Sequence, residues 1–358
     1  MVSASDESNG HAVTSRTAIE AAERLQRHLE THAGQLVIDA DTHITDVDSL
    51  HALPRHRYET TPDYYHGRPI SAEDAILEMD MAGVDMALVW QNPATTVYGG
   101  SLDANTRTLT QANRYVLDSA LRYPDRFIPA GWVDAKACGL DYTLELVEKL
   151  VVDFGFLIVK LNPAQNGYPI NGPLSLAVVD RIVELGAIPA FHFGADTPFT
   201  PAEGLRCVAE RYPERPVIAV HMGGGGAGYL EAEELYRVAR VLGFECPNIR
   251  YVFGAKRDTH IETDLIAYQL AGEPFCRHLF CGSDAPYGRM TWNFGGFRAM
   301  FQSLIDGAAH TDARVRARPG LFTQEAAQNY MGGNFARFVA GEYRRLLAAQ
   351  QPCSLRCP

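Results

Sequence analysis

Short apolar runs recur along most of the chain, and segments with helical spacing separate them. Strands that are apolar along their whole length are typical of a parallel sheet with helices on both faces. Eight such runs, each followed by a helix-length segment, favour a closed (β/α)8 TIM barrel over an open doubly wound sheet. No GxGxxG follows the first run, which weakens a dinucleotide-binding fold. The expected strands are 36–40, 85–90, 127–133, 155–161, 187–193, 216–222, 249–253 and 278–284.

The segments around these runs predict the domain organisation. Residues 16–32 carry Ala, Ile, Leu and Glu at helical spacing, which predicts a helix before the first strand. Residues 46–75 are rich in Pro, His, Arg and Tyr without clear periodicity, so we expect a long loop over or beside the mouth of the barrel. The predicted units are a polar tail and helix (1–34), the barrel (35–340), and a helix end and tail (341–358).

Composition indicates an ordinary globular protein. Of the 358 residues, 46% are hydrophobic and 21% are charged, and no apolar run approaches the ~20 residues that cross a bilayer. The net charge of −11 argues against nucleic acid or an anionic membrane as partner; it allows a small acidic substrate and a homodimer. The seven cysteines are scattered, and Cys353 and Cys357 lack zinc-ribbon spacing. We expect a cytoplasmic protein.

Polar residues interrupt the apolar pattern at the ends of several expected strands. In "LVIDADTHITD" (36–46), Asp41 and His43 are two residues apart, and side chains at this spacing point to the same face of a strand. The fifth strand ends at His192, the sixth at His221 and the eighth at Asp284. The carboxyl ends of barrel strands meet at one mouth, where catalytic residues lie.

Each of these residues has a structural explanation when taken alone. A single His at a strand end is commonly a hydrogen-bonded core residue, and Asp284 has the position of a helix N-cap. Lys160, in the fourth strand, is equally well explained by an ion pair in the barrel wall. Taken together, imidazoles and carboxylates at one mouth fit a divalent transition metal. Zinc is favoured and manganese is the alternative.

The order of these motifs resembles the amidohydrolase superfamily. It is most similar to the amidohydrolase-2 branch of metal-dependent enzymes, which includes aminocarboxymuconate semialdehyde decarboxylase and resorcylate decarboxylases. The supporting phrases are "VKLNP", "AVHMGG", "LFCGSDAP" and "AAQNYMGGNFARFV". The resemblance covers about residues 35–340 and implies a barrel with one metal ion.

The resemblance implies a role for each matching residue. Asp41 (where many members have a His or Glu), His43, His192 and Asp284 would bind the metal. Asp284 would also accept a proton as general base, and His221 would be catalytic just off the metal. Members of the superfamily that bind two metal ions have a carbamylated lysine on the fourth strand. Since the resemblance is to the one-metal type, Lys160 is taken as a residue that contacts the substrate or supports the ligands.

The reaction stays open between two classes. We favour hydrolysis of a C–N or C–O bond of a small cyclic, amide or ester substrate by metal-activated water. The alternative is non-oxidative decarboxylation of a small aromatic or unsaturated acid. After the seventh expected strand, Lys256 and Arg257 could bind an acidic group of the substrate, and His260 lies nearby in the sequence. The two cations are otherwise explained as solvent-exposed or paired with carboxylates of the protein. Trp90 is predicted to contact the substrate, and aromatic residues near the mouth either line a cyclic substrate or belong to ordinary packing: Trp90, Trp132, Tyr287 and Trp292.

Overall fold

A set of parallel strands forms the centre of the molecule. The computed structural model describes residues 5–62, 67–194, 197–224, 234–254, 256 and 258–350. Every strand pairing within these residues is parallel, and the strand positions agree with the eight apolar runs. The strands are β1 Ile38–Ile44, β2 Met86–Gln91, β3 Phe127–Pro129, β4 Gly131–Val133, β5 Ile158–Leu161, β6 Ile188–His192, β7 Val217–Val220, β8 Ile249–Phe253 and β9 Leu279–Cys281.

Backbone hydrogen bonds connect these strands in the order of a barrel. The pairing runs β1-β2-β3 and β4-β5-β6-β7-β8-β9, and Ala130 alone separates β3 from β4. The Ala130 N–H donates to the Val89 carbonyl at 3.0 Å, so β3 and β4 act as one barrel strand. A parallel bridge between Thr42 and Ala285 brings the first strand beside the end of the last. The predicted (β/α)8 fold is confirmed.

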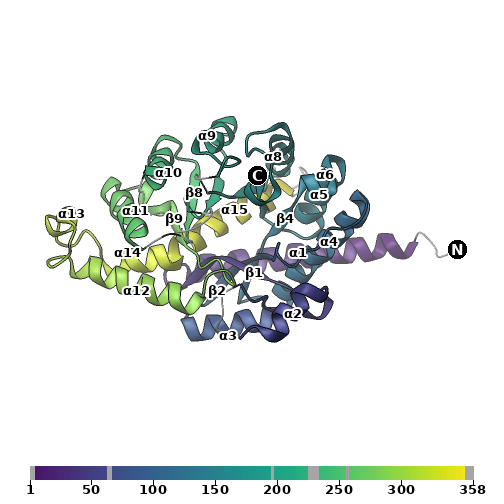
Figure 1. Ribbon diagram of the computed structural model, residues 1–358, viewed down its shortest axis with the longest axis horizontal. Coiled ribbons are helices and arrows are strands. Elements are labelled where there is room, and N and C mark those ends of the chain that lie inside the picture. The colour runs from purple at the N-terminus through teal and green to yellow at the C-terminus, as the bar shows by residue number, and fades with distance from the viewer. Residues whose placement is uncertain are drawn as a thin grey trace, which may run out of the picture.

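Helices surround the strands, as Figure 1 shows. Their ends follow ordinary capping chemistry; for example, Ser71 and Asp74 form a capping box at the start of α3. None of the described helices has the length and apolar composition needed to cross a membrane. The α-helices are α1 Ser5–His32, α2 Ala52–Thr60, α3 Ala72–Ala82, α4 Leu102–Arg122, α5 Ala135–Cys138, α6 Leu140–Glu148, α7 Pro163–Asn166, α8 Pro173–Glu184, α9 Ala202–Arg211, α10 Glu234–Glu245, α11 Asp258–Ala271, α12 Met290–Asp306, α13 Ala313–Arg316, α14 Gln324–Gln328 and α15 Asn334–Gln350; the shorter 3₁₀ and π segments are η1 Val47–Ser49, η2 Lys149–Asp153, η3 Phe275–Arg277 and η4 Asn329–Gly333.

The segment after β1 differs in part from the predicted loop, because it contains the helix α2. This helix has no apolar stripe, and Pro54 is its one buried residue, so hydrophobic periodicity gave no signal for it. Tertiary contacts hold it instead. The Arg68 guanidinium lies 4.0 Å from the centre of the Tyr58 ring and donates to the Tyr58 carbonyl at 3.0 Å. Arg55 donates to the Asp48 carbonyl at 2.7 Å.

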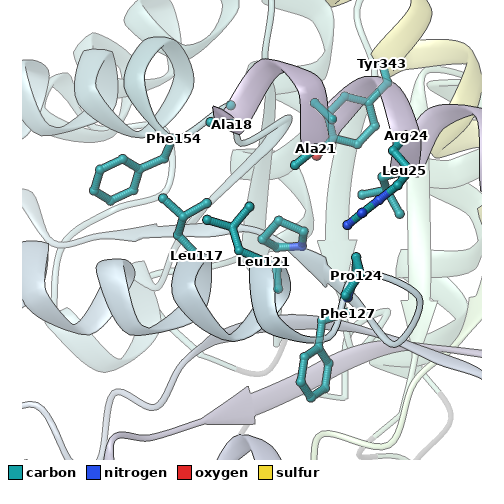
Figure 2. Close-up of a pocket in the computed structure, with 14 residues that line it drawn as sticks. Ala18, Ala21, Arg24, Leu25, Leu117, Leu121, Pro124, Phe127, Phe154 and Tyr343 are labelled. Carbon is teal, nitrogen blue, oxygen red and sulfur yellow. The ribbon is translucent and has the colours of Figure 1, made fainter. Parts of the chain in front are cut away.

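The N-terminal helix α1 packs on the barrel next to α15. The helix predicted over residues 16–32 is confirmed, and in the structure it begins earlier, at Ser5. Figure 2 shows its apolar face against α4, with a cavity of about 30 Å³ between them that is lined by Ala18, Leu25, Leu117 and Leu121, among others. The start of β3 also lines this cavity, so α1 covers the amino-terminal end of the barrel. The domain boundaries stay a prediction; α15 runs through position 340 without a break.

Candidate metal centre

The end of β1 places two polar side chains inside an otherwise apolar barrel. All seven residues of β1 are buried, and Asp41 and His43 are 1% and 3% exposed. The pairing with β2 shifts by one residue between Asp39 and Thr42, which is the mark of a β-bulge. Bulges are frequent next to active sites, where they redirect side chains.

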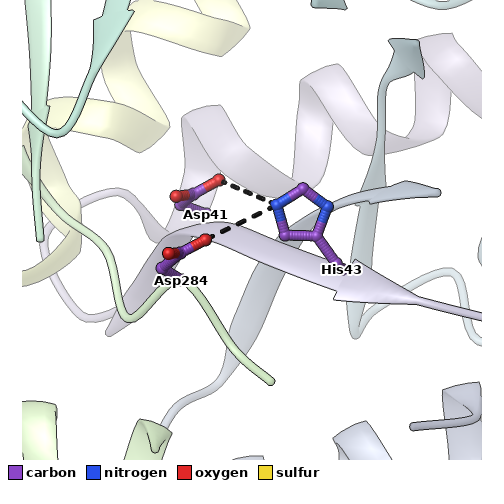
Figure 3. Close-up of side chains that lie close together, drawn as sticks. All are labelled: Asp41, His43 and Asp284. Atoms are coloured by element: carbon purple, nitrogen blue, oxygen red, sulfur yellow. Dashed lines mark ion pairs between the residues drawn. The ribbon is translucent and has the colours of Figure 1, made fainter. Parts of the chain in front are cut away.

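Asp41, His43 and Asp284 form a group that fits a metal ion. One potential ligand atom from each lies within 4.8 Å of the other two. The His43 Nε2 atom is 3.6 Å from Asp284 Oδ1 and 3.9 Å from Asp41 Oδ1, as Figure 3 shows. A tetrahedral zinc site with bonds of ~2.0–2.1 Å has neighbouring ligand atoms ~3.3 Å apart. Small side-chain movements would therefore bring all three residues to ligand distances.

The orientation of His43 directs its Nε2 atom to the position where a metal would bind. Its Nδ1 atom lies 2.9 Å from the carbonyl oxygen of Gln91. A carbonyl can only accept, so Nδ1 carries the proton and Nε2 presents its lone pair to the two carboxylates. Metal-binding histidines typically have their second nitrogen fixed in this way.

Asp284 is held in place by contacts between the ends of β1 and β9. Its backbone N–H donates to the Asp41 carbonyl at 2.9 Å, and its φ of 58° is left-handed, a conformation that is uncommon outside glycine and concentrates at functional sites. The preceding residue, Ser283, donates its N–H to Asp39 Oδ1 at 2.9 Å and its hydroxyl to Asp39 Oδ2. The sequence analysis missed this role of Asp39, although its place two residues before Asp41 was a signal.

A glycine and a buried carboxyl complete this junction. A Cβ atom on Gly282 would lie 3.1 Å from the Cβ of Asp41 and 2.5 Å from a Val252 methyl, so only glycine fits there. Burial raises the pKa of Asp39 to about 7, against the opposing effect of its hydrogen bonds with Ser283 and Asp41. Asp39 therefore supports the backbone of the site.

The two carboxylate oxygens of Asp41 have different surroundings. Oδ1 accepts from Trp90 Nε1 at 2.8 Å and from Lys160 Nζ at 3.0 Å. Oδ2 is buried and has no hydrogen-bond partner among the described residues. Burial raises the pKa of Asp41, but the charge of Lys160 and the nearby His221 and His43 outweigh burial, and the pKa lies below its ordinary value. Asp41 is thus an ionised carboxylate with one oxygen unpaired.

His221 and His192 form a pair beside this oxygen. His221 Nε2 lies 3.1 Å from His192 Nδ1, and His221 Nδ1 lies 3.9 Å from Asp41 Oδ2. Like that oxygen, His221 Nδ1 is buried without a hydrogen-bond partner in the described part of the chain. Burial, with His192 next in effect, lowers the pKa of His221 well below its ordinary value. Two buried polar atoms without partners therefore lie 3.9 Å apart beside the metal-binding group, where a polar group of a substrate could contact them.

His192 differs in position from the other three predicted ligands. In the described part of the chain, the group of close ligand atoms contains Asp41, His43 and Asp284 and does not include His192. The His192 ring instead lies with its centre 4.5 Å from that of His221. Its role as a metal ligand stays a prediction.

Aromatic rings enclose the metal-binding group. The Lys160 ammonium lies 4.5 Å from the centre of the Trp90 ring and 5.3 Å from that of Trp132. The rings of Trp132 and Tyr287 are each centred 5.6 Å from that of His43. Trp90 and Lys160, predicted to contact the substrate, both bind Asp41. Trp132 and Tyr287 are therefore the aromatic residues that pack against His43, whereas Trp90 contacts Asp41.

Of the two cations predicted after β8, the structure describes only Lys256. Lys256 is buried and forms an ion pair with Asp264, which also pairs with Arg240 at 2.7 Å. Arg257 lies outside the described residues, as do Cys353 and Cys357. The ammonium of Lys256 is thus bound to a protein carboxylate, and a substrate role for Lys256 or Arg257 stays a prediction. His260 is buried with its ring 4.4 Å from that of Tyr236, and Trp292 on α12 is 68% exposed.

Solved structures share this fold. An uncharacterized TIM-barrel protein from Bordetella bronchiseptica has a TM-score of 0.57 and 17% identity, over 85% of this chain and 99% of that chain. 5-Carboxyvanillate decarboxylase LigW from Sphingomonas paucimobilis has a TM-score of 0.56 and 16% identity, over 84% of this chain and 98% of that chain. Manganese-bound 5-carboxyvanillate decarboxylase from Novosphingobium aromaticivorans has a TM-score of 0.58 and 16% identity, over 86% of this chain and 96% of that chain. These likenesses establish the TIM-barrel fold.

A family model provides the assignment. No curated protein sequence matches the chain. The model of the Amidohydrolase family (Amidohydro_2) matches residues 38–338, from the start of β1 into α15. The match therefore covers the whole barrel and every residue of the candidate metal centre, as the motif order in the sequence predicted. The chain belongs to the amidohydrolase-2 family of the amidohydrolase superfamily.

Proposed function

We propose that the protein is a metal-dependent, non-oxidative decarboxylase of a small aromatic or unsaturated carboxylic acid. The observation that carries the proposal is Asp284, a carboxyl group beside His43 whose pKa is raised by burial and then by the charge of Asp41, against the opposing effect of His43. A raised pKa favours the protonated form of the carboxyl group, which is the form that decarboxylation needs. Hydrolysis, favoured by the sequence analysis, needs a base instead. The fold is also that of solved decarboxylases of hydroxylated benzoic acids.

The surroundings of the site support an aromatic acid as substrate. Trp132 and Tyr287 contact the His43 ring edge-on, and the Tyr287 hydroxyl donates to Asn92 Oδ1 at 2.6 Å. Rings held in this way can pack against a flat substrate. Two solved neighbours carry an aromatic carboxylate or its analogue in the crystal, which agrees with this substrate class.

In the proposed reaction, Asp284 gives its proton to the substrate carbon that carries the carboxylate. The bond between this carbon and the carboxylate breaks, its electron pair forms the new C–H bond, and neutral CO2 leaves. Asp284 Oδ1 faces His43, so we assign the transferred proton to Oδ2. Asp284 then regains a proton from water. His221, which stays neutral because its pKa is lowered, positions the substrate through Nδ1.

Asp41, His43 and Asp284, with His192 as the predicted further ligand, would hold a divalent cation. When bound, this cation supplies positive charge that binds an anionic substrate and stabilises the charge that develops on its oxygens. We propose manganese or zinc. Three of the solved decarboxylase structures contain manganese, whereas the imidazole and carboxylate donors suit both ions. The five cysteines in the described residues are free thiols, which agrees with the proposed cytoplasmic location.

The test is an isotope experiment on protein loaded with Mn²⁺ or Zn²⁺. Candidate substrates are 2,6-dihydroxybenzoate and 5-carboxyvanillate, with a cyclic amide and a lactone as hydrolase substrates. In heavy water, we expect CO2 release and one deuterium on the carbon that lost it. Labelled oxygen from ¹⁸O-water in a product acid, without deuterium on carbon, would establish hydrolysis instead.

The Asp284→Asn variant tests the proton donor. Asn keeps the shape of the side chain but cannot give up a carboxyl proton, so we expect kcat to fall by ~10²-fold or more. The matched control is Asp141→Asn, on the exposed face of α6, which should leave kcat unchanged. Full turnover by Asp284→Asn would exclude Asp284 as the proton donor.

A further inference from the structure

We propose that Lys160 is a built-in counter-cation of the metal centre. Its ammonium neutralises Asp41 in the metal-free protein and weakens the binding of a divalent cation. This inference rests on the metal centre proposed above. Lys160 acts through Asp41 and is therefore a positioning residue.

Burial shows that Lys160 and Asp41 need each other in the metal-free protein. Lys160 is 0% exposed and Asp41 is 1% exposed, and their charged atoms are 3.0 Å apart. A buried charge without an opposite charge is strongly unfavourable. The Trp90 and Trp132 rings, centred 4.5 Å and 5.3 Å from the ammonium, stabilise it further.

The contacts of Lys160 also give the two oxygens of Asp41 different surroundings. The Lys160 ammonium and the Trp90 N–H both bind Oδ1, which leaves Oδ2 unpaired. Oδ2 is the oxygen that faces His221. Lys160 and Trp90 thus fix the rotation of the carboxylate. The ammonium shares the oxygen, Oδ1, that lies 3.9 Å from His43 Nε2.

The charge of Lys160 has an energetic consequence for metal binding. A divalent cation at Asp41 would stand beside an ammonium that cannot move into water, and like charges repel at this range. The cation would also neutralise a carboxylate that Lys160 already neutralises. Removing the ammonium should therefore strengthen metal binding and destabilise the metal-free protein. A wall ion pair with a purely structural role predicts lower stability in both forms and no gain in affinity.

The experiment compares Lys160→Met with the wild type. Met keeps most of the side-chain length and loses the charge. Mn²⁺ and Zn²⁺ affinities are measured by calorimetry on chelator-treated protein, and Tm is measured with and without the metal. We expect the Kd of Lys160→Met to fall by tenfold or more, and the Tm of the metal-free variant to fall below that of the wild type. The rise in Tm on adding metal should be larger than in the wild type.

Two further variants separate the possible causes. Lys149→Met, at the start of η2 and before β5, removes a lysine charge from the opposite end of the barrel and should leave Kd unchanged. Trp90→Phe removes the second donor to Oδ1 but keeps the charge, so the affinity should not rise. If Lys160→Met fails to fold without metal, refolding with graded Mn²⁺ gives the same comparison.

The outcomes distinguish this inference from the metal centre on which it rests. A wild type that binds neither metal rejects the centre itself. A wild type that binds metal, with Lys160→Met binding equally or more weakly, overturns the role of Lys160 alone. Tighter binding by Lys149→Met to the same extent would show that the effect comes from overall charge, and would also overturn it.

Discussion

Single residues at the mouth of the barrel combine opposite electrostatic effects within a few ångströms. Lys160 keeps Asp41 ionised, whereas burial raises the pKa of the neighbouring Asp284. Two carboxyl groups with pKa values shifted in opposite directions are suited to different tasks, one as a ligand and one as a proton carrier. His221, with its left-handed φ of 76°, completes the group from a third strand.

His221 is predicted to act in catalysis without binding the metal. In His221→Asn, the new residue tolerates the left-handed backbone but cannot replace the imidazole. We expect kcat to fall by ~10²-fold, as for a lost acid–base or positioning group, while metal content by elemental analysis stays near normal. His51→Asn, at an exposed position, is the control. Loss of the metal in His221→Asn would make His221 a ligand, and unchanged kcat would leave it without a role.

At the scale of elements, the segments that form the metal centre differ from those that mainly stabilise the fold. The carboxyl ends of the strands carry the metal centre, and α1 covers the opposite end. The sequence predicted the strands well because each is apolar on both faces, a pattern that few other structures share. It did not predict α2, which is held by Arg55 and Arg68 through tertiary contacts. Contacts of this kind leave no periodic pattern in the sequence.

Helix α1 should contribute to stability and not to turnover. Leu29 on α1 is 0% exposed, so Leu29→Ala removes buried apolar volume and should lower the free energy of unfolding by ~2–5 kcal/mol. Leu53→Ala is the matched control, because Leu53 on α2 is 79% exposed and should change stability by no more than ~0.5 kcal/mol. Urea unfolding measures both. Equal stability of the two variants would contradict the packing of α1 described here.

The turn before β9 should contribute to acid sensitivity. Burial, followed by the charge of Arg250, lowers the pKa of His278 from its ordinary 6.5 to about 3. Below the ordinary value, the unfolded chain takes up a proton at His278 and the folded chain does not, so stability is lost as the pH falls from 6.5 towards 3. The slope from this residue is at most ~1.4 kcal/mol per pH unit.

His278→Leu removes this proton uptake. Urea unfolding between pH 7 and 4 should show a shallower loss of stability in the variant than in the wild type. Parallel curves would mean that His278 is protonated equally in the folded and unfolded chains.

At the scale of the whole molecule, the fold and the location of the site could be predicted from the sequence, whereas the pairing of side chains could not. Strand ends in a barrel meet at one mouth, so polar residues at those ends indicate a site before any coordinates exist. Which of them touch depends on backbone details such as the bulge in β1 and the left-handed residues Asp284 and His221. Hence the sequence indicates that His192 lies at the mouth but not that it contacts His221.

Asp41, His43 and Asp284 form the metal centre on which the proposed chemistry depends. The most direct test is the metal content of purified protein after incubation with Mn²⁺ or Zn²⁺ and removal of excess ions, for the wild type and for His43→Gln. Gln cannot present the lone pair that His43 Nε2 directs at the two carboxylates. We predict about one metal ion per chain in the wild type and a loss of most of it in His43→Gln. A wild type without metal, or a variant that retains the full amount, would contradict the account.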